Sequence, residues 1–312
     1  MTPLPFASLT EEFLEGYIPP ARSKTTCRLM RQSIRELQED KAITSSTDLT
    51  PAALWRWLRR YPDRTPITAS THLRNHRALC NYAVGRGCLI SSPFSYDSKL
   101  RKATHVKKSA RRRHHSLVEI GCVLGYLLDR SRLSWEDGRL CALAWTVAHT
   151  GVRAAEAQHA EVADFDLAEG WLKIEPKPNH PLKTESSERE VPIPPPLAKI
   201  LGEWLPRSRS TWAFPGSKRR GPWVGGAGGY RPVDRLQEAG RAVQVRGFTF
   251  LSLRHSYITH GSGPWRLGPR EIQQIAGHGL LDTQEHYTGR DRANLRAAVA
   301  TIAFPIPAKI AL

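Results

Sequence analysis

The stretch that decides the fold is Thr150-Gly151-Val152-Arg153-Ala154-Ala155-Glu156. It follows a helical pattern over about 135–149, and Thr150-Gly151 is expected to turn the chain into another helix that carries Arg153 and Glu156. An arginine and a glutamate three positions apart commonly form a simple surface pair on a helix. The stretch alone therefore identifies no site, and its interpretation depends on the residues that follow it.

Four further polar residues follow in order along the chain. They are Lys183, Arg254 within Leu253-Arg254-His255, His278, and Tyr287, which stands nine positions after that histidine. Alone, the histidine would be read as structural and the tyrosine as a half-buried core aromatic. With Arg153 they form a set that can bind, attack and protonate a phosphodiester without a metal.

Each member of this set has a chemical reason to be present. Two arginines, Arg153 and Arg254, can hold the non-bridging oxygens of a phosphate and stabilise the charge of the transition state. Tyr287 is the candidate nucleophile, because a cationic pocket favours the phenolate. Lys183 is the candidate proton donor to the leaving sugar oxygen, and His278 could contact the phosphate or assist proton transfer. Such chemistry requires neither a metal nor a nucleotide cofactor.

In type, order and spacing, these residues resemble the active-site boxes of the tyrosine recombinase (phage integrase) family. The first box of that family is similar to T-G-x-R-x-x-E, which residues 150–156 match. The second is H-x-L-R-H, and residues 253–255 match its last three positions. The third is L-G-H with a tyrosine nine residues later, which Ala276-Gly277-His278 and Tyr287 resemble.

The resemblance assigns three more roles. The family's lysine lies in a β-hairpin, commonly as K-T before a strand that ends in proline, and Lys183-Thr184 before Glu190-Val191-Pro192 looks similar. Two other lysines lie near it in the chain and leave this assignment open. Glu156 is interpreted as structural support for the first arginine, and His255 as an additional contact to the phosphate.

The resemblance fails at position 251, where the family has a histidine and this chain has Leu251. A leucine side chain cannot donate a hydrogen bond or move a proton. Either other residues suffice and the chain is an active recombinase, or it binds DNA with impaired catalysis. The tyrosine, both arginines and the lysine favour the active form. A type IB topoisomerase-like enzyme, acting as a monomer on nonspecific duplex, is a third alternative.

Composition supports a nucleic-acid partner. The 312 residues include 46 Lys and Arg against 29 Asp and Glu, a formal net charge of +17, which favours binding to a polyanion. The five cysteines show no C-x-x-C spacing, so the sequence predicts neither a zinc site nor a disulfide framework. No apolar run approaches the roughly 20 residues of a membrane span. We therefore expect a cytoplasmic, nucleoid-associated protein without a membrane partner.

The pattern predicts a mainly α fold with a small antiparallel β-sheet (α+β), in two domains. Residues 1–98 are expected to form a helical, SAM-like core-binding domain that begins with the capping box Ser8-x-x-Glu11, and residues 116–312 a catalytic domain that begins with Ser116-x-x-Glu119. Strands are predicted at 171–175 and 190–193. Later helices are predicted at 232–243, 249–260, 269–276, 282–288 and 292–303.

Residues 99–115 are expected to be a basic linker between these domains. The run from 99 to 113 contains eight Lys or Arg and no acidic residue. A strap across DNA phosphates is the functional interpretation, and a solvated loop is the alternative. The candidate DNA contacts are Lys99, Arg101, Lys102, Lys107, Lys108, Arg111, Arg112 and Arg113.

The resemblance also implies partners. Double-stranded DNA would be cut by a homotetramer on synapsed sites, through a Holliday junction, for a mobile element, and accessory DNA-bending proteins would be compatible with this. The helices begin almost at Met1, so a simple recombination site is expected. The apolar stripe of Leu295, Ala298, Val299 and Ile302 either packs internally or docks onto a neighbouring protomer.

Overall fold

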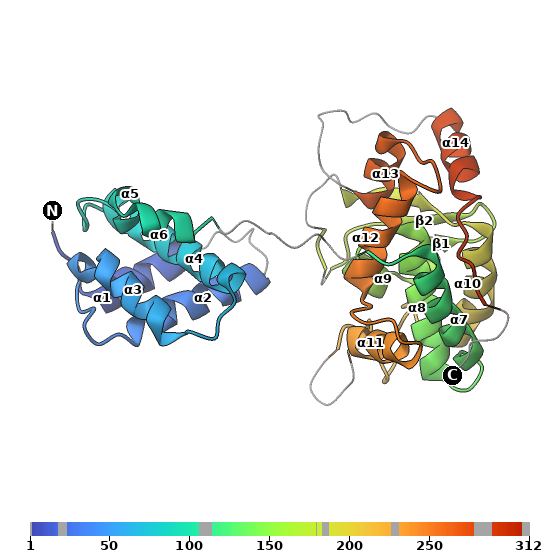
Figure 1. Ribbon diagram of the computed structural model, residues 1–312, viewed down its shortest axis with the longest axis horizontal. Coiled ribbons are helices and arrows are strands. Elements are labelled where there is room, and N and C mark those ends of the chain that lie inside the picture. Colours follow the sequence, from blue (N-terminus) through green and yellow to red (C-terminus); the bar gives the residue numbers. More distant parts are fainter. Residues whose placement is uncertain are drawn as a thin grey trace. The chain divides into compact units, whose positions relative to one another are not determined.

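The chain folds into two compact units, residues 1–110 and 111–312 (Figure 1). The computed structural model describes residues 2–17, 24–105, 114–178, 180–182, 187–225, 231–277 and 289–307. Within those ranges, none of the helices combines the length and the apolar character needed to span a bilayer.

Helices build the first unit. Thr50 caps a helix that opens with Pro51, and Thr65 with Pro66 repeats the arrangement, so both N-termini have a side-chain acceptor and a proline that needs no hydrogen bond. The elements are α1 (Phe6–Glu12), the π-helical turn η1 (Phe13–Tyr17), α2 (Lys24–Gln38), η2 (Ser46–Asp48), α3 (Pro51–Arg60), α4 (Pro66–Gly85), α5 (Pro93–Tyr96) and α6 (Ser98–Ala103).

Two expectations for this unit are corrected. The capping box at Ser8 is not used, because α1 begins at Phe6 after Pro5 and its N-cap makes no side-chain hydrogen bond. Residues 99–103, expected in the linker, lie in α6, whose Leu100 is fully buried in the core of the first unit. The helical unit therefore extends past residue 98.

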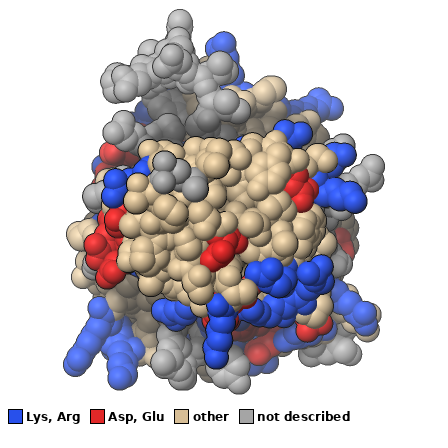
Figure 2. Space-filling view, turned by 90° about the vertical axis from the view of Figure 1, so that its left-hand side faces the viewer, with Lys and Arg blue, Asp and Glu red and all other residues tan. Residues whose placement is uncertain are grey.

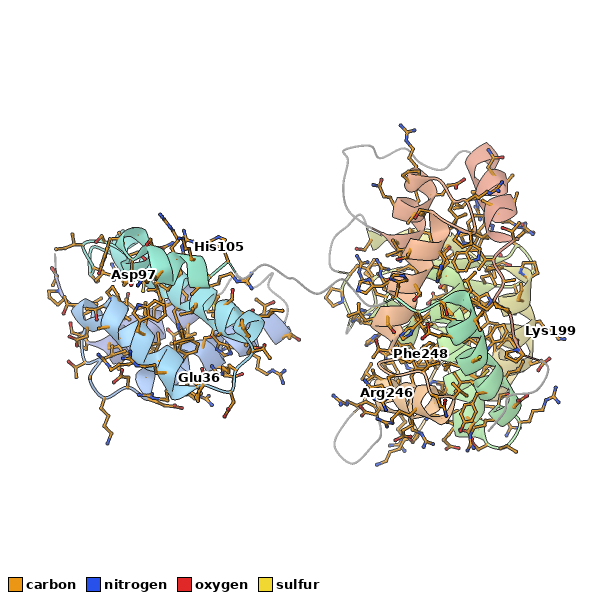
Figure 3. All side chains as sticks on the ribbon, in the orientation of Figure 1. Glu36, Asp97, His105, Lys199, Arg246 and Phe248 are labelled. Atoms are coloured by element: carbon orange, nitrogen blue, oxygen red, sulfur yellow. The ribbon has the colours of Figure 1, made fainter. Side chains whose placement is uncertain are left out.

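A buried polar cluster lies inside this unit, around Glu36 of α2 (Figure 3). The two carboxylate oxygens of Glu36 accept hydrogen bonds from Arg64 at 2.6 and 2.7 Å, and the imidazole of His72 lies 3.4 Å away. Burial disfavours ionisation of Glu36, but the Arg64 hydrogen bonds and the His72 charge outweigh it and lower its pKa. His76 lies fully buried beside this cluster, and burial lowers its pKa to about 3.

The second unit combines helices with a three-stranded antiparallel sheet in the order β1-β2-β3. In the register of the sheet, Leu172 pairs with Val191 and Asp166 pairs with Trp171. This confirms the predicted fold class. The elements are α7 (Leu117–Arg130), α8 (Trp135–Thr150), α9 (Ala154–Gln158), η3 (Val162–Asp164), β1 (Phe165–Asp166), β2 (Trp171–Ile174), β3 (Arg189–Pro192), α10 (Pro195–Ser208), α11 (Pro232–Ala242), α12 (Phe250–Gly261), α13 (Pro269–Ala276) and α14 (Gly289–Val299).

Helix α8 is the centre of the second unit. Every residue from Gly138 to Thr150 is buried, and α7, α10 and α12 pack around the helix. A helix buried on all sides cannot shift without disturbing several neighbours at once. Its C-terminal end therefore provides a firm support for the residues that follow it.

The C-terminal helix α14 packs against its own chain. Leu295, Val299 and Ile302 are buried in the core of the second unit. Arg292 pairs with Glu190 of β3 at 3.2 Å and lies over the ring of Trp171 at 4.5 Å. The apolar stripe therefore packs inside its own chain, which is one of the two alternatives that the sequence left open.

Candidate active site

Gly151 makes the turn from α8 into α9. Its φ of +62° is in the left-handed region, and its N–H donates to the carbonyl of Val147 at 3.0 Å. A Cβ at this position would collide with the ring of Tyr257, which α12 packs against the turn. The tight turn places Arg153 at the N-cap of α9, directly before its first residue Ala154.

Arg153 is held in place by Glu156. Its Nη1 lies 2.6 Å from one carboxylate oxygen of Glu156, and its backbone N–H donates to the other oxygen at 2.8 Å. Its Nη2 donates to the carbonyl of Gly277 at 2.9 Å. The Arg153 side chain is 31% exposed, whereas that of Glu156 is 3% exposed. Arg153 thus has a buried anchor and a guanidinium that solvent can reach.

Arg254 approaches the same place from α12. It is 6% exposed. Its Nη1 donates to the carbonyl of Gly151 and its Nη2 to that of Ala276, both at 2.7 Å. Burial, followed by the nearby charge of Arg153, lowers the pKa of Arg254 to about 10. The group therefore stays cationic at neutral pH.

A third arginine, Arg189, was not among the residues singled out from the sequence. It is the first residue of β3, and its side chain is 4% exposed. Its Nη2 and Nη1 reach the two oxygens of Glu156 at 2.8 and 3.3 Å, and its Nε donates to the carbonyl of Ile275 at 2.8 Å. Burial raises the pKa of Glu156, but the hydrogen bond and charge of Arg189, together with the hydrogen bonds of Arg153, outweigh burial and lower the pKa. Glu156 is thus an ionised carboxylate between two guanidiniums.

The three arginines converge on the C-terminal end of α13. Arg189, Arg254 and Arg153 donate to the successive carbonyls of Ile275, Ala276 and Gly277. Carbonyls at the end of a helix have no partner within the helix and carry partial negative charge, so cations are favourable there. Residues from three distant parts of the sequence therefore meet immediately before His278.

Three of the predicted site residues, Lys183, His278 and Tyr287, lie outside the described residues. The nearby Lys177 lies 2.8 Å from Asp164 and 3.4 Å from Glu161, so it is engaged in ion pairs. His255 is partly buried on α12. Leu251, in the first turn of that helix, is 63% exposed.

The predicted DNA contacts are divided in the same way. Lys99, Arg101 and Lys102 are exposed on α6, whereas Lys107, Lys108, Arg111, Arg112 and Arg113 lie outside the described residues. On the face shown in Figure 2, Lys and Arg gather towards one edge, and the middle is mostly uncharged. In the part of the chain that the structure describes, no group of three or more His, Cys, Asp or Glu could hold a metal ion.

Comparison with known proteins extends this picture. No protein-family model matches the chain. A stretch of 171 residues is 29% identical to tyrosine recombinase XerC of Bifidobacterium longum (strain DJO10A), covering 51% of this chain and 46% of that protein. Tyrosine recombinase XerA of Pyrococcus furiosus is 29% identical over 153 residues, which cover 48% of this chain and 50% of that protein. Over about half of its length, the chain is therefore similar to tyrosine recombinases.

Solved structures share the fold of this chain at low sequence identity. The Tn1549 transposon integrase in complex with a circular intermediate DNA has a TM-score of 0.69 at 14% identity, over 94% of this chain and 99% of that one. A lambda integrase tetramer bound to a Holliday junction has a TM-score of 0.66 at 14% identity, over 90% of this chain and 80% of that one. The chain spans about half the length of the curated relatives that it matches.

Proposed function

We propose that this chain is a site-specific DNA recombinase that cuts and rejoins duplex DNA through a 3′-phosphotyrosyl intermediate on Tyr287. The observation that carries the proposal is the convergence of Arg153 and Arg254 on successive carbonyls at the end of α13. Two cations fixed side by side provide the paired donors that a phosphodiester needs. They lie where the chain continues to His278 and Tyr287.

In the proposed reaction, Arg153 and Arg254 hold the non-bridging oxygens of the scissile phosphate. The phenolate oxygen of Tyr287 attacks phosphorus, a P–O bond forms, and the bond to the 5′ oxygen breaks. Lys183 gives that oxygen a proton, and His278 and His255 contact the phosphate. The released 5′-hydroxyl then attacks the phosphotyrosine of the partner duplex and frees Tyr287. No metal or cofactor takes part.

The proposed partners follow from charge and from the resemblance to tyrosine recombinases. The net charge of +17 favours double-stranded DNA, and exposed Lys99, Arg101 and Lys102 offer phosphate contacts. We assign core-site binding to the helical domain, a strap on the DNA to the basic linker around residues 99–115, and the chemistry to residues 116–312. Four copies on synapsed sites would serve a mobile element in the cytoplasm, at the nucleoid, with accessory DNA-bending proteins as further partners.

The test is a covalent trap with Tyr287→Phe. Nicked duplexes carrying sequence from either side of the gene should form a denaturant-resistant adduct with the wild type and none with the variant, because phenylalanine has no nucleophilic oxygen. DNA affinity should be unchanged. Tyr257→Phe is the matched control, since the buried Tyr257 hydroxyl has no hydrogen-bond partner among the described residues and its loss should leave the adduct intact. An adduct from Tyr287→Phe would refute the mechanism.

The second candidate function is a DNA-binding relative with impaired catalysis, which exposed Leu251 favours. If a missing proton carrier limits the reaction, Leu251→His should raise the rate of adduct formation by about 10²-fold. Leu251→Ala, which removes the apolar side chain without adding a proton carrier, should not. Equal rates for wild type and Leu251→His would eliminate a deficit at this position.

A further inference from the structure

We infer that Arg189 is a positioning residue for the reaction proposed above, on which this inference rests. Through Glu156 it orients the phosphate-binding Arg153. Through the carbonyl of Ile275 it fixes the end of α13, from which the chain continues to His278. One side chain on β3 thereby sets the relative position of two parts of the site that are far apart in the sequence.

The link to Arg153 runs through a shared carboxylate. Glu156 accepts from Arg189 with both oxygens, at 2.8 and 3.3 Å, and from Arg153 at 2.6 Å. A planar guanidinium can bind both oxygens of a carboxylate at once and so fixes the plane of that carboxylate, which a lysine ammonium cannot do. Arg153 therefore takes its direction from a carboxylate whose own orientation Arg189 sets.

The link to α13 is equally close. The Nε of Arg189 donates to the carbonyl of Ile275 at 2.8 Å, and its guanidinium lies against Gly277 so closely that a Cβ there would come within 2.8 Å of Nη1. Gly277 has a φ of +61° and ends the helix. The end of α13 is thus held by a hydrogen bond and by a close van der Waals contact with the same side chain.

Arg189 does not itself contact the substrate. Nε donates to Ile275, Nη1 donates to Glu156 and to the carbonyl of Ser187, and Nη2 donates to Glu156. These contacts use four of the five N–H groups of a guanidinium. With a side chain that is 4% exposed, Arg189 acts through its neighbours.

The first experiment measures hydrogen–deuterium exchange on the full-length protein without DNA. The reporters are the amides of Arg153 and Gly277, which donate to the Glu156 carboxylate at 2.8 Å and to the carbonyl of Gln273 at 2.9 Å. Arg189→Lys keeps a positive charge beside Glu156 and so avoids an unpaired buried carboxylate. The lysine ammonium cannot, however, bind both carboxylate oxygens in one plane as the guanidinium does. We expect faster exchange at both reporters, with the amides of α8 unchanged.

The matched control is Arg292→Gln. Arg292 also pairs with a glutamate, since it lies 3.2 Å from Glu190 of β3, but its side chain is 40% exposed. Its loss should leave both reporters unchanged. A control that raised exchange at the same two amides would show a general loosening of the sheet and would overturn the inference.

The second experiment compares two duplexes in single-turnover adduct formation. One carries the natural scissile phosphate, and in the other a methyl group replaces one non-bridging oxygen. Arg189→Lys should lower the rate on the natural duplex by about 100-fold, because misplacing a group by about 1 Å has that effect, with DNA affinity kept within about threefold. The ratio of the two rates should fall by about tenfold, because a misplaced Arg153 gains less from the charged oxygen.

A merely structural role would lower both rates equally and leave their ratio at the wild-type value, which would overturn the inference. Wild-type exchange at Arg153 and Gly277 in Arg189→Lys would also overturn it, whatever the protein does on DNA. If the proposed function itself is wrong, the wild-type protein will form no Tyr287-dependent adduct. That result does not depend on Arg189, so the two failures can be told apart.

Discussion

At the scale of single residues, Gly151 shows how one position constrains the site. It has a left-handed φ of +62° and no space for a Cβ against Tyr257. We predict that Gly151→Ala lowers the free energy of unfolding by about 2–4 kcal/mol, which combines the backbone cost with that of overpacking. Urea denaturation followed by circular dichroism measures the change.

Gly202 provides the control for that substitution. It lies within α10, and a Cβ there would meet no other atom within 4 Å. Gly202→Ala should therefore stabilise the protein by about 0.5–1 kcal/mol, because alanine loses less backbone entropy in a helix. Equal losses for the two variants would contradict the steric explanation at Gly151.

Arg189 shows what the sequence could not reveal at this scale. It stands at the start of a strand that was predicted correctly, but its partners Glu156 and Ile275 are 33 and 86 positions away. No periodicity or local spacing connects residues at such separations. By contrast, Arg153 and Arg254 could be singled out because short motifs surround them, and the structure brings both to the end of α13.

At the scale of elements, a capping-box motif in the sequence did not by itself decide where a helix begins. The Ser116 hydroxyl oxygen accepts a hydrogen bond from the N–H of Glu119, and the Glu119 carboxylate accepts one from the N–H of Ser116. Helix α7 therefore begins at its predicted capping box. The same capping-box motif at Ser8 lies inside α1, which begins at Phe6. A four-residue signature cannot distinguish these cases, since the docking of the chain decides which residue begins the helix.

This difference is testable with two matched substitutions. Ser116→Ala should lower the midpoint of thermal unfolding, because it removes a cap worth about 1 kcal/mol. Ser8→Ala should be neutral or slightly stabilising, since alanine is the better residue inside a helix. Calorimetry of the full chain distinguishes them, and a larger loss at Ser8 would mean that its hydroxyl has a role in α1.

Helix α10 was missed for a different reason. Its apolar positions Leu197, Leu201, Trp204 and Leu205 have helical spacing and are buried. Prolines stand at the first helical positions and again at Pro206, and because proline disfavours helices, the sequence did not predict one here. Proline is compatible with the first turn of a helix, and Pro206 lies close to the end. Here packing of the apolar face outweighs the local preference.

At the scale of the whole molecule, both units contain buried neutral histidines that make stability depend on pH. Burial lowers the pKa of His76 to about 3 in the first unit and that of His149 to about 4 in the second. Unfolding returns each to about 6.5, so below that pH the unfolded chain binds more protons. Stability is therefore fully present above pH 6.5 and is lost as the pH falls towards these values.

The predicted slope is about 1.4 kcal/mol per pH unit for each such histidine between pH 6.5 and its folded pKa. The free energy of unfolding, measured with urea from pH 4.5 to 8, gives this slope. His76→Gln should flatten it, because glutamine does not titrate. His105→Gln, at an exposed position of the same unit (Figure 3), should not. An unchanged slope in His76→Gln would exclude that histidine as a source.

The hydrogen bonds of three arginines to the carbonyls at the end of α13 have a thermodynamic consequence. Three guanidiniums and one carboxylate meet there, so these groups carry an excess of two positive charges, and all of them except Arg153 are buried. An anion that binds here neutralises that excess and binds only the folded chain. Tighter anion binding therefore raises the free energy of unfolding. We therefore expect bound DNA to raise the free energy of unfolding of this protein.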